Sequence, residues 1–165
     1  LTFEDCYTLL TGIEACMNSR PITPISSNPS DLAVLTPSHF LIGDSLIQPV
    51  EANLLQTPVN HLSRWQHLQQ VRQHFWKRWS REYLHQLQTR TKWIYDYKNM
   101  KIGTMVLLID DLPPLKWSLG RVVAVHPGED GVVRVVSVQT SRGILKRAVR
   151  KLCELPVNED LPENC

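Results

Sequence analysis

The sequence predicts an α+β protein in which an N-terminal helical fragment and a long amphipathic linker helix precede a small five-stranded SH3-like β-barrel. Residues 61–90 contain neither proline nor glycine and carry apolar side chains at helical spacing. Residues 99–155 instead consist of short β-rich runs, and five of the seven glycines lie between positions 103 and 143. With 165 residues, 42% of them hydrophobic, the chain is long enough to bury a core.

The first predicted element is a helix that begins after Thr2, a suitable N-cap residue, and stops before Pro21. Its apolar residues recur at intervals of three or four positions: Phe3, Cys6, Tyr7, Leu10, Ile13 and Met17. Because the sequence already follows a helical pattern at Leu1, we expect the chain to be a fragment of a longer reading frame.

The next segment, residues 21–58, holds six of the eleven prolines and predicts an extended connector rather than a packed domain. One short helix is expected within it, with Thr36 as the cap, Pro37 at the first helical position and Gly43 at the end. We interpret this short helix as a docking turn of the connector.

The long helix, from about residue 61 to 90, is predicted to be amphipathic with a basic back, and would extend about 45 Å. One arc of the helix is apolar and holds Leu62, Trp65, Leu68, Val71, Phe75, Trp76, Trp79, Tyr83 and Leu87. The opposite arc holds His67, His74, Lys77, Arg78, Arg81 and His85. Arg72 falls on the apolar arc, where it could be a buried partner for one of the acidic residues between positions 1 and 59.

Five strands are expected after residue 98, at 105–109, 119–126, 132–139, 144–149 and 152–155. Turn residues separate them at 113–114, 127–131 and 140–143. Valines occupy both faces of the run 132–136, so its inward-facing residues stay undetermined. The acidic, proline-containing residues 156–165 are expected to be disordered.

The net charge of +2 hides a segregation of charge along the chain. Residues 1–59 carry one basic and six acidic residues, whereas residues 60–98 carry eight basic and two acidic ones. Residues 99–155 carry nine basic and five acidic residues, and the last ten residues carry three acidic ones. A polyanionic partner would therefore meet the middle of the chain and the predicted barrel.

Neither a metal site nor an active site is predicted. The four cysteines form no CxxC pair, no histidine spacing completes a zinc site, and the thiols are expected to be reduced. The acidic residues Glu4, Asp5 and Glu14 are interpreted as the solvent face of a helix, and Asp110 and Asp111 as loop residues. No nucleophile elbow, phosphate loop or metalloprotease motif is present, so we expect the chain not to be an enzyme.

The candidate functional residues are cations that could contact nucleic-acid phosphates. They are Lys77, Arg78, Arg81, Arg121, Arg134, Lys146, Arg147, Arg150 and Lys151, of which the last four form the densest cluster. The rings of Trp65, Trp76, Trp79 and Tyr83 are interpreted as packing residues of the long helix. Trp117 is the only aromatic residue between 101 and 155, which disfavours a cage for methylated lysine.

Several motifs in order along the chain resemble the end of BEL/Pao-type retrotransposon integrases. They are Leu1-Thr2-Phe3-Glu4, 18–24 (NSRPITP), 35–43 (LTPSHFLIG), the block 75–79 (FWKRW) with Tyr83-Leu84, 117–122 (WSLGRV), 127–135 (PGEDGVVRV) and 147–152 (RAVRKL). The similarity extends over nearly the whole chain, to about Leu155.

The resemblance implies a division of the chain into parts. Residues 1–58 would be the terminal helix and exit segment of a truncated RNase H-like core, 59–98 a linker helix, and 99–155 an SH3-like C-terminal domain. Integrases of this type use an Asp, Asp, Glu set that binds two divalent ions, and no position here matches that set. By this resemblance, the catalytic residues and their metal cofactor would lie upstream, and the chain itself would hold no cofactor.

Two function hypotheses follow. The first is a non-catalytic integrase portion that holds DNA without reading bases, alongside other integrase chains or the upstream core. The second is an interaction or oligomerisation fragment, domesticated or remnant, acting through the long aromatic helix. No signal segment, membrane span or small-molecule site is apparent, so an intracellular protein is expected, in the nucleus when it acts on DNA.

Overall fold

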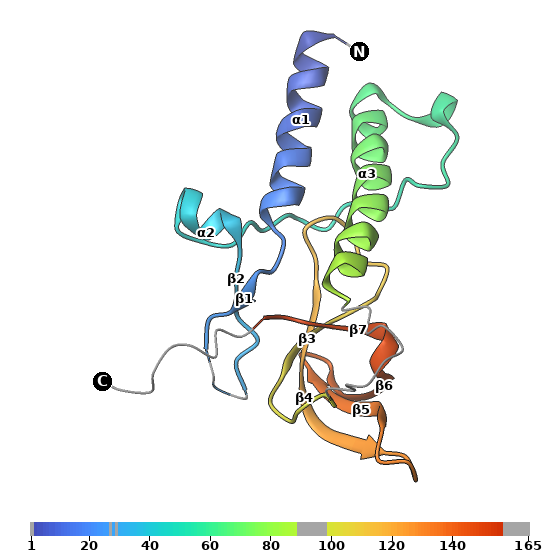
Figure 1. Ribbon diagram of the computed structural model, residues 1–165. Coiled ribbons are helices and arrows are strands. Elements are labelled where there is room, and N and C mark those ends of the chain that lie inside the picture. The colour runs from blue at the N-terminus through green and yellow to red at the C-terminus, as the bar shows by residue number, and fades with distance from the viewer. Residues whose placement is uncertain (1, 27, 29, 89–98, 157–165) are drawn as a thin grey trace.

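The computed structural model describes residues 2–26, 28, 30–88 and 99–156, and it confirms the predicted α+β class (Figure 1). Two helices, α1 (Phe3–Asn18) and α3 (Arg64–Leu87), lie side by side at one end of the molecule. A five-stranded antiparallel sheet lies at the other end, and a two-stranded ribbon belongs to the connector. The predictions for the linker beyond residue 88 and for the tail beyond 156 lie outside the described residues.

Helix α1 begins as predicted, because Thr2 caps it and exchanges hydrogen bonds with Asp5 in a capping box. The stripe that packs on α3 is not the apolar one, however. Asp5, Gly12 and Cys16 lie on the buried side, and a Cβ added to Gly12 would lie 2.9 Å from Cδ of Arg72. Small residues here let the two helices approach closely.

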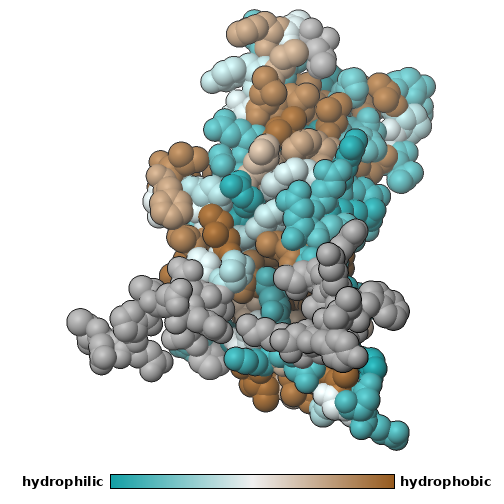
Figure 2. All heavy atoms as spheres, viewed as in Figure 1, coloured by the Kyte–Doolittle hydropathy of each residue, from teal (hydrophilic) through white to brown (hydrophobic). Residues whose placement is uncertain are grey.

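The predicted apolar stripe of α1 therefore faces solvent (Figure 2). Phe3 is 81% exposed, Tyr7 67% and Leu10 64%. The neighbouring helix α2 (Pro37–Ile42) also exposes apolar side chains, and Figure 2 shows the resulting hydrophobic surface over both helices. An uncovered apolar surface of this kind is typical of a face that packs against something else.

An ion pair joins the start of α1 to the start of α3. Nε of Arg64 donates to Oδ1 of Asp5 at 2.8 Å, and Nη2 donates to Oδ2 at 2.7 Å. The Arg64 guanidinium and the Thr2 backbone N–H lower the pKa of the Asp5 carboxyl from 3.8 to about 2.

This lowered pKa predicts a pH dependence of stability. A carboxyl whose pKa is lower in the folded state stabilises the fold above its unfolded pKa, and the stabilisation is lost as the pH falls from about 4 to about 2. We expect the Asp5→Asn variant to lack this part of the dependence when thermal unfolding is followed between pH 2 and 5. Parallel curves for the variant and the unchanged chain would contradict the role given to the pair.

The connector is extended, as predicted, and is held by contacts to α3 and the sheet. It contains β1 (Thr23–Pro24), paired with β2 (Val34–Leu35), and α2, which ends at Gly43 with a φ of 76°. Two buried glutamines of α3 hold the last part of the connector. Gln73 accepts from the Leu54 N–H and donates to the Ala52 carbonyl oxygen, and Gln70 donates to the Leu54 carbonyl oxygen.

Helix α3 is shorter at its start than predicted. A 3-10 turn, Val59–His61, comes first, and Ser63 then forms a capping box with Gln66, so that the α-helix begins at Arg64 rather than near residue 61. The expectation for Arg72 is confirmed: its Nη2 lies 2.5 Å from Oε2 of Glu51, one of the acidic residues between positions 1 and 59. The helix ends at Leu87.

The sheet contains all five predicted strands, within two residues of their expected bounds: β3 (Met105–Leu108), β4 (Ser118–Pro127), β5 (Val133–Thr140), β6 (Gly143–Ala148) and β7 (Leu152–Glu154). The order is β6-β5-β4-β3-β7, so the last strand pairs with the first. A 3-10 turn, η2 (Val149–Lys151), joins β6 to β7. Among the described residues no ladder joins β6 to β7, and the sheet is curved but open.

Register shifts in the β4–β5 pairing settle which valines point inward. Val136 and Val138 are fully buried and Val133 is nearly so, whereas Arg134 and Val135 are exposed next to one another. Strict alternation cannot place two adjacent residues outside, which is why the sequence alone left this strand undetermined.

The sheet has a core on each side of β3. Val106 and Leu108 point into the concave side with Val122, Val136 and Val138. Met105 and Leu107 point to the other side, where Leu84 of α3 and Cys153 of β7 cover them. Helix α3 is therefore packed on the sheet and does not merely link two modules.

Gly120 of β4 marks the tightest point of the sheet. A Cβ there would lie 2.3 Å from Cγ1 of Val138 and 3.0 Å from the Gln139 carbonyl oxygen. We expect the Gly120→Ala variant to lose about 1–3 kcal/mol of unfolding free energy, measured by urea denaturation. The Gly131→Ala variant is the comparison. Gly131 has open space around its Cβ position and a φ of 74°, so only backbone strain acts there.

Candidate nucleic-acid interface

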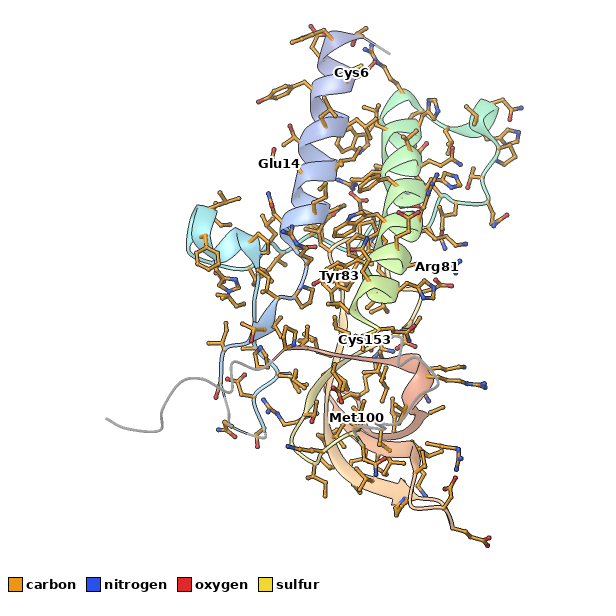
Figure 3. All side chains as sticks on the ribbon, in the orientation of Figure 1. Cys6, Glu14, Arg81, Tyr83, Met100 and Cys153 are labelled. Carbon is orange, nitrogen blue, oxygen red and sulfur yellow. The ribbon has the colours of Figure 1, made fainter. Side chains whose placement is uncertain are left out.

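The basic face of α3 lies opposite the packed face (Figure 3). Figure 3 shows Tyr83 directed toward α1 and Arg81 directed away from it. Lys77 and Arg78 are exposed as well. Two of these three cations are held by carboxylates, because Arg78 Nε lies 3.0 Å from Glu82 Oε1 and Arg81 Nη2 lies 2.9 Å from Asp111 Oδ1.

The four cations of the densest cluster lie on β6 and η2, but they do not share one face. Lys146 lies opposite Ser137 in the β5–β6 ladder, and Arg147 lies opposite the core residue Val136. Because successive side chains of a strand point to opposite faces, Lys146 lies on the outer face and Arg147 on the concave side. The expectation of a single cluster therefore needs correction.

A side-chain contact joins the basic part of α3 to η2. Gln88, the residue that caps the C-terminus of α3, donates from Nε2 to the Arg150 carbonyl oxygen at 2.8 Å. Lys77, Arg81 and Gln88 are spaced by four and seven positions, so they share one side of the helix. The contact thus places the basic side of α3 next to η2, which follows β6 in the chain. We call the following set of cations the basic edge: Lys77, Arg78, Arg81, Lys146, Arg147, Arg150 and Lys151.

Arg121 was predicted to contact phosphate, and the structure contradicts this. Its side chain is buried, and its guanidinium donates to the carbonyl oxygens of Gly103, Ser26 and Asp31 at 3.0–3.1 Å. Arg121 thus fastens the connector to the sheet. Positive charge alone gave no signal of this role, because the connector residues lie 90 or more positions earlier in the chain.

Arg134 lies near the tip of the β4–β5 hairpin and is also engaged. Its Nη2 lies 2.5 Å from Oδ2 of Asp130, and this contact lowers the pKa of the Asp130 carboxyl. The acidic turn therefore offsets much of its charge, and Arg134 lies outside the basic edge.

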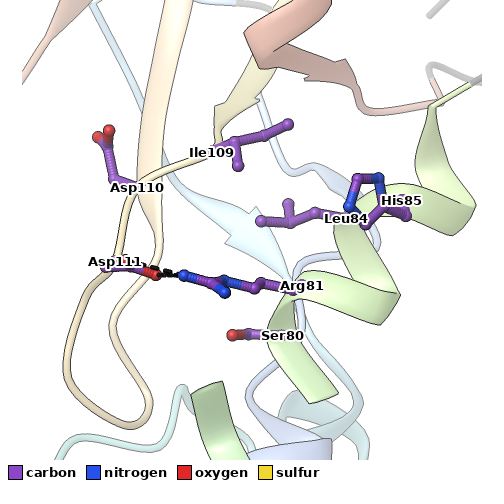
Figure 4. Close-up of a pocket in the computed structure, with 7 residues that line it drawn as sticks. All are labelled: Ser80, Arg81, Leu84, His85, Ile109, Asp110 and Asp111. Carbon is purple, nitrogen blue, oxygen red and sulfur yellow. Dashed lines mark hydrogen bonds and ion pairs between the residues drawn. The ribbon is translucent and has the colours of Figure 1, made fainter. Parts of the chain in front are cut away.

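A shallow pocket of about 380 Å³ lies between α3 and the loop after β3 (Figure 4). Arg81 and Asp111 face each other across it, whereas Asp110 points away. The other lining residues are Ser80, Leu84, His85 and Ile109. The contact between Asp111 and Arg81 was not predictable from residue spacing, since the two residues are 30 positions apart.

The aromatic residues of α3 form a packed cluster with Trp117. The centroid of the Trp76 ring lies 4.9 Å from that of Trp117, and those of Tyr83 and Trp79 lie 5.6 and 6.0 Å from it. Trp76 donates to the Leu112 carbonyl oxygen at 2.8 Å, and Tyr83 donates to the Pro21 carbonyl. These contacts are made within one chain.

Trp65 departs from the interpretation given to the helix rings, because 55% of it is exposed. It lies one residue into α3, before the region where the helix reaches the connector and the sheet. Of the other three rings, Trp76 is buried, and Trp79 and Tyr83 are partly buried and contact Trp117 within the chain.

Two of the three cysteines in the described part of the chain, Cys16 and Cys153, are buried, and Cys6 is exposed. Burial raises the pKa of the Cys16 and Cys153 thiols to about 11, so neither is a thiolate at neutral pH. Within the described ranges, no group of three His, Cys, Asp or Glu residues could hold a metal ion. No described helix has the length and apolar character needed to cross a membrane.

In a comparison with protein families, residues 63–155 match the Family of unknown function (DUF5641). The matched segment begins at the cap of α3 and ends just after β7, which is the unit formed by α3 and the sheet. No curated protein and no solved structure matches the chain.

Proposed function

The chain belongs to the Family of unknown function (DUF5641), and we propose that its α3–sheet unit binds nucleic acid through phosphate contacts on the basic edge. We propose further that the chain is the non-catalytic C-terminal portion of a BEL/Pao-type retrotransposon integrase and supports DNA integration. Its partners would be DNA and other integrase chains or the upstream core, in the nucleus of the cell.

The observation that carries the proposal is the arrangement of the basic edge. Five of its seven cations, Lys77, Lys146, Arg147, Arg150 and Lys151, have no ion pair among the described residues. They extend from mid-α3 to β6, and four of them are exposed, whereas Arg147 is partly buried on the concave side of the sheet. Several exposed cations in series are suited to the regularly spaced charges of a phosphate backbone.

The same arrangement favours backbone contacts over the reading of bases. The cations lie on an edge strand, a short turn and the flank of a helix whose other side is packed in the core. Three of the four rings assigned to α3, those of Trp76, Trp79 and Tyr83, are engaged in the cluster around Trp117, and the exposed ring of Trp65 lies at the start of the helix, away from η2 and β6. We therefore expect little dependence on sequence.

The exposed stripe of α1 supports the wider proposal. Phe3, Tyr7 and Leu10 are more than half exposed, as expected if residues 1–58 come from a larger core that is not present here. Catalysis and its divalent metal ions would then belong to that core, and the present chain would supply no cofactor ligand.

The test is fluorescence anisotropy of the full chain with a labelled random-sequence duplex at increasing salt. If these five cations each neutralise one phosphate, the logarithm of affinity should fall against the logarithm of salt with a slope of about −4.5. A slope near zero, or no binding at 50 mM salt, would contradict the proposal.

A further inference from the structure

Strand β6 offers a second kind of binding site. We infer that its outer edge accepts an extended acidic peptide, which adds to the sheet as a sixth strand. This inference goes beyond nucleic-acid binding, because it depends on the backbone of β6 and not only on charge.

The edge itself is the first observation. Strand β6 is the outermost strand of the sheet and pairs through all six of its residues with β5. No described strand pairs with its other side. Alternate residues of such a strand direct N–H and C=O groups away from the sheet, where they form a template for another strand.

The side chains of β6 supply the second observation. Ile144 and Lys146 both lie on the outer face, and Ile144 is 63% exposed. The strand contains Lys146 and Arg147 and no acidic residue, and Arg142 and Arg150 flank it. Each face of β6 therefore carries one apolar residue and one cation. A matching partner strand has two carboxylates in succession opposite Lys146 and Arg147, next to two apolar residues opposite Ile144 and Leu145.

Charge also selects among the possible occupants. A second copy of β6 would place its own Lys146 and Arg147 against the same cations, which is unfavourable. A neutral apolar strand would form the backbone hydrogen bonds with β6 but would supply no carboxylates to pair with those cations. An acidic strand gains both the ladder and the charge pairs, so it is the occupant that the edge admits.

The probe is a labelled six-residue peptide with the order Val-Asp-Asp-Val-Val-Asp, which offers a carboxylate to each face of β6, added to the full chain. A control peptide carries Pro in place of each Val, which keeps the charge but removes half of the backbone N–H donors. We expect the Asp-Val peptide to bind at least about 10-fold more tightly than the Asp-Pro peptide and to slow amide hydrogen exchange in β6.

Three outcomes would overturn the inference. Equal affinity for the two peptides would mean that only charge acts, even if DNA binding is present. Slow exchange of every β6 amide in the free chain would mean that the edge is already occupied. Unchanged peptide binding in the Lys146→Glu variant, with Lys116→Glu as the control at another exposed lysine, would remove the charge selection.

Because Lys146 and Arg147 also belong to the basic edge, duplex DNA should displace the Asp-Val peptide. The two proposals remain separable. If DNA does not bind but the Asp-Val peptide does, only the nucleic-acid proposal fails. If both peptides bind equally but DNA binds with a strong salt dependence, only the inference about β6 fails.

Discussion

The Trp76→Ala variant is expected to lose about 3–5 kcal/mol of unfolding free energy, a large part of the stability of a domain this size. Trp76 is 3% exposed and contacts Trp79 and Trp117. Its removal leaves a cavity between α3 and the loop that joins β3 to β4, and takes away the donor to the Leu112 carbonyl oxygen of that loop. Urea denaturation at constant pH measures the loss.

The matched control is Trp65→Ala, which removes a ring of the same size from the exposed start of the same helix. Here the loss is expected to stay below about 1 kcal/mol. Equal shifts of the unfolding midpoint in the two variants would contradict the account of α3 as a helix packed on the sheet.

Reversal of the four cations of β6 and η2 should have the largest effect on nucleic-acid binding. With Lys146, Arg147, Arg150 and Lys151 all changed to Glu, we expect duplex affinity to fall at least about 100-fold at 100 mM salt. The salt slope should flatten by about 3 to 4, because each lost phosphate contact removes about 0.9 of slope. Anisotropy measures both quantities.

A pair of double variants controls for net charge. Arg150→Glu with Lys151→Glu changes the charge by the same amount as Lys101→Glu with Lys116→Glu, and all four residues are exposed. The first pair belongs to the basic edge and the second does not. If both pairs weaken binding equally, the chain attracts DNA only through its total charge, and the basic edge has no special role.

The local structure was largely predictable because its signals are local. The cap at Thr2, the short helix between Thr36 and Gly43, and the five strands with their glycine turns all follow from residues a few positions apart. The start of α3 was placed three residues too early, because the absence of proline and glycine from residue 61 onward does not mark the cap, which Ser63 supplies.

The buried face of α1 could not be inferred from periodicity alone. The pattern correctly identified the apolar stripe, yet α3 packs on the opposite stripe of Asp5, Gly12 and Cys16. An apolar stripe marks a face that favours burial, and it does not specify which segment covers it.

The candidate site was predictable in composition but not in detail. Exposure of Lys77 followed from the amphipathic pattern of the helix, whereas Lys146 was identified only as a member of the densest basic cluster. Burial of Arg121 and neutralisation of Arg81 by Asp111 arise from segments that meet only in the folded chain. Long-range contacts of this kind carry no signal in the spacing of residues along one element.

The most direct test of the basic edge is a map of the bound surface by nuclear magnetic resonance, in which unlabelled duplex DNA is added to the ¹⁵N-labelled full chain. The account predicts shifts concentrated at Lys77, Arg81 and Gln88 of α3 and at residues 146–151. Signals of α1 and of the Asp130 turn should stay in place. Shifts that spread evenly over the molecule, or that centre on α1 and α2, would contradict the assignment of the nucleic-acid interface to the basic edge.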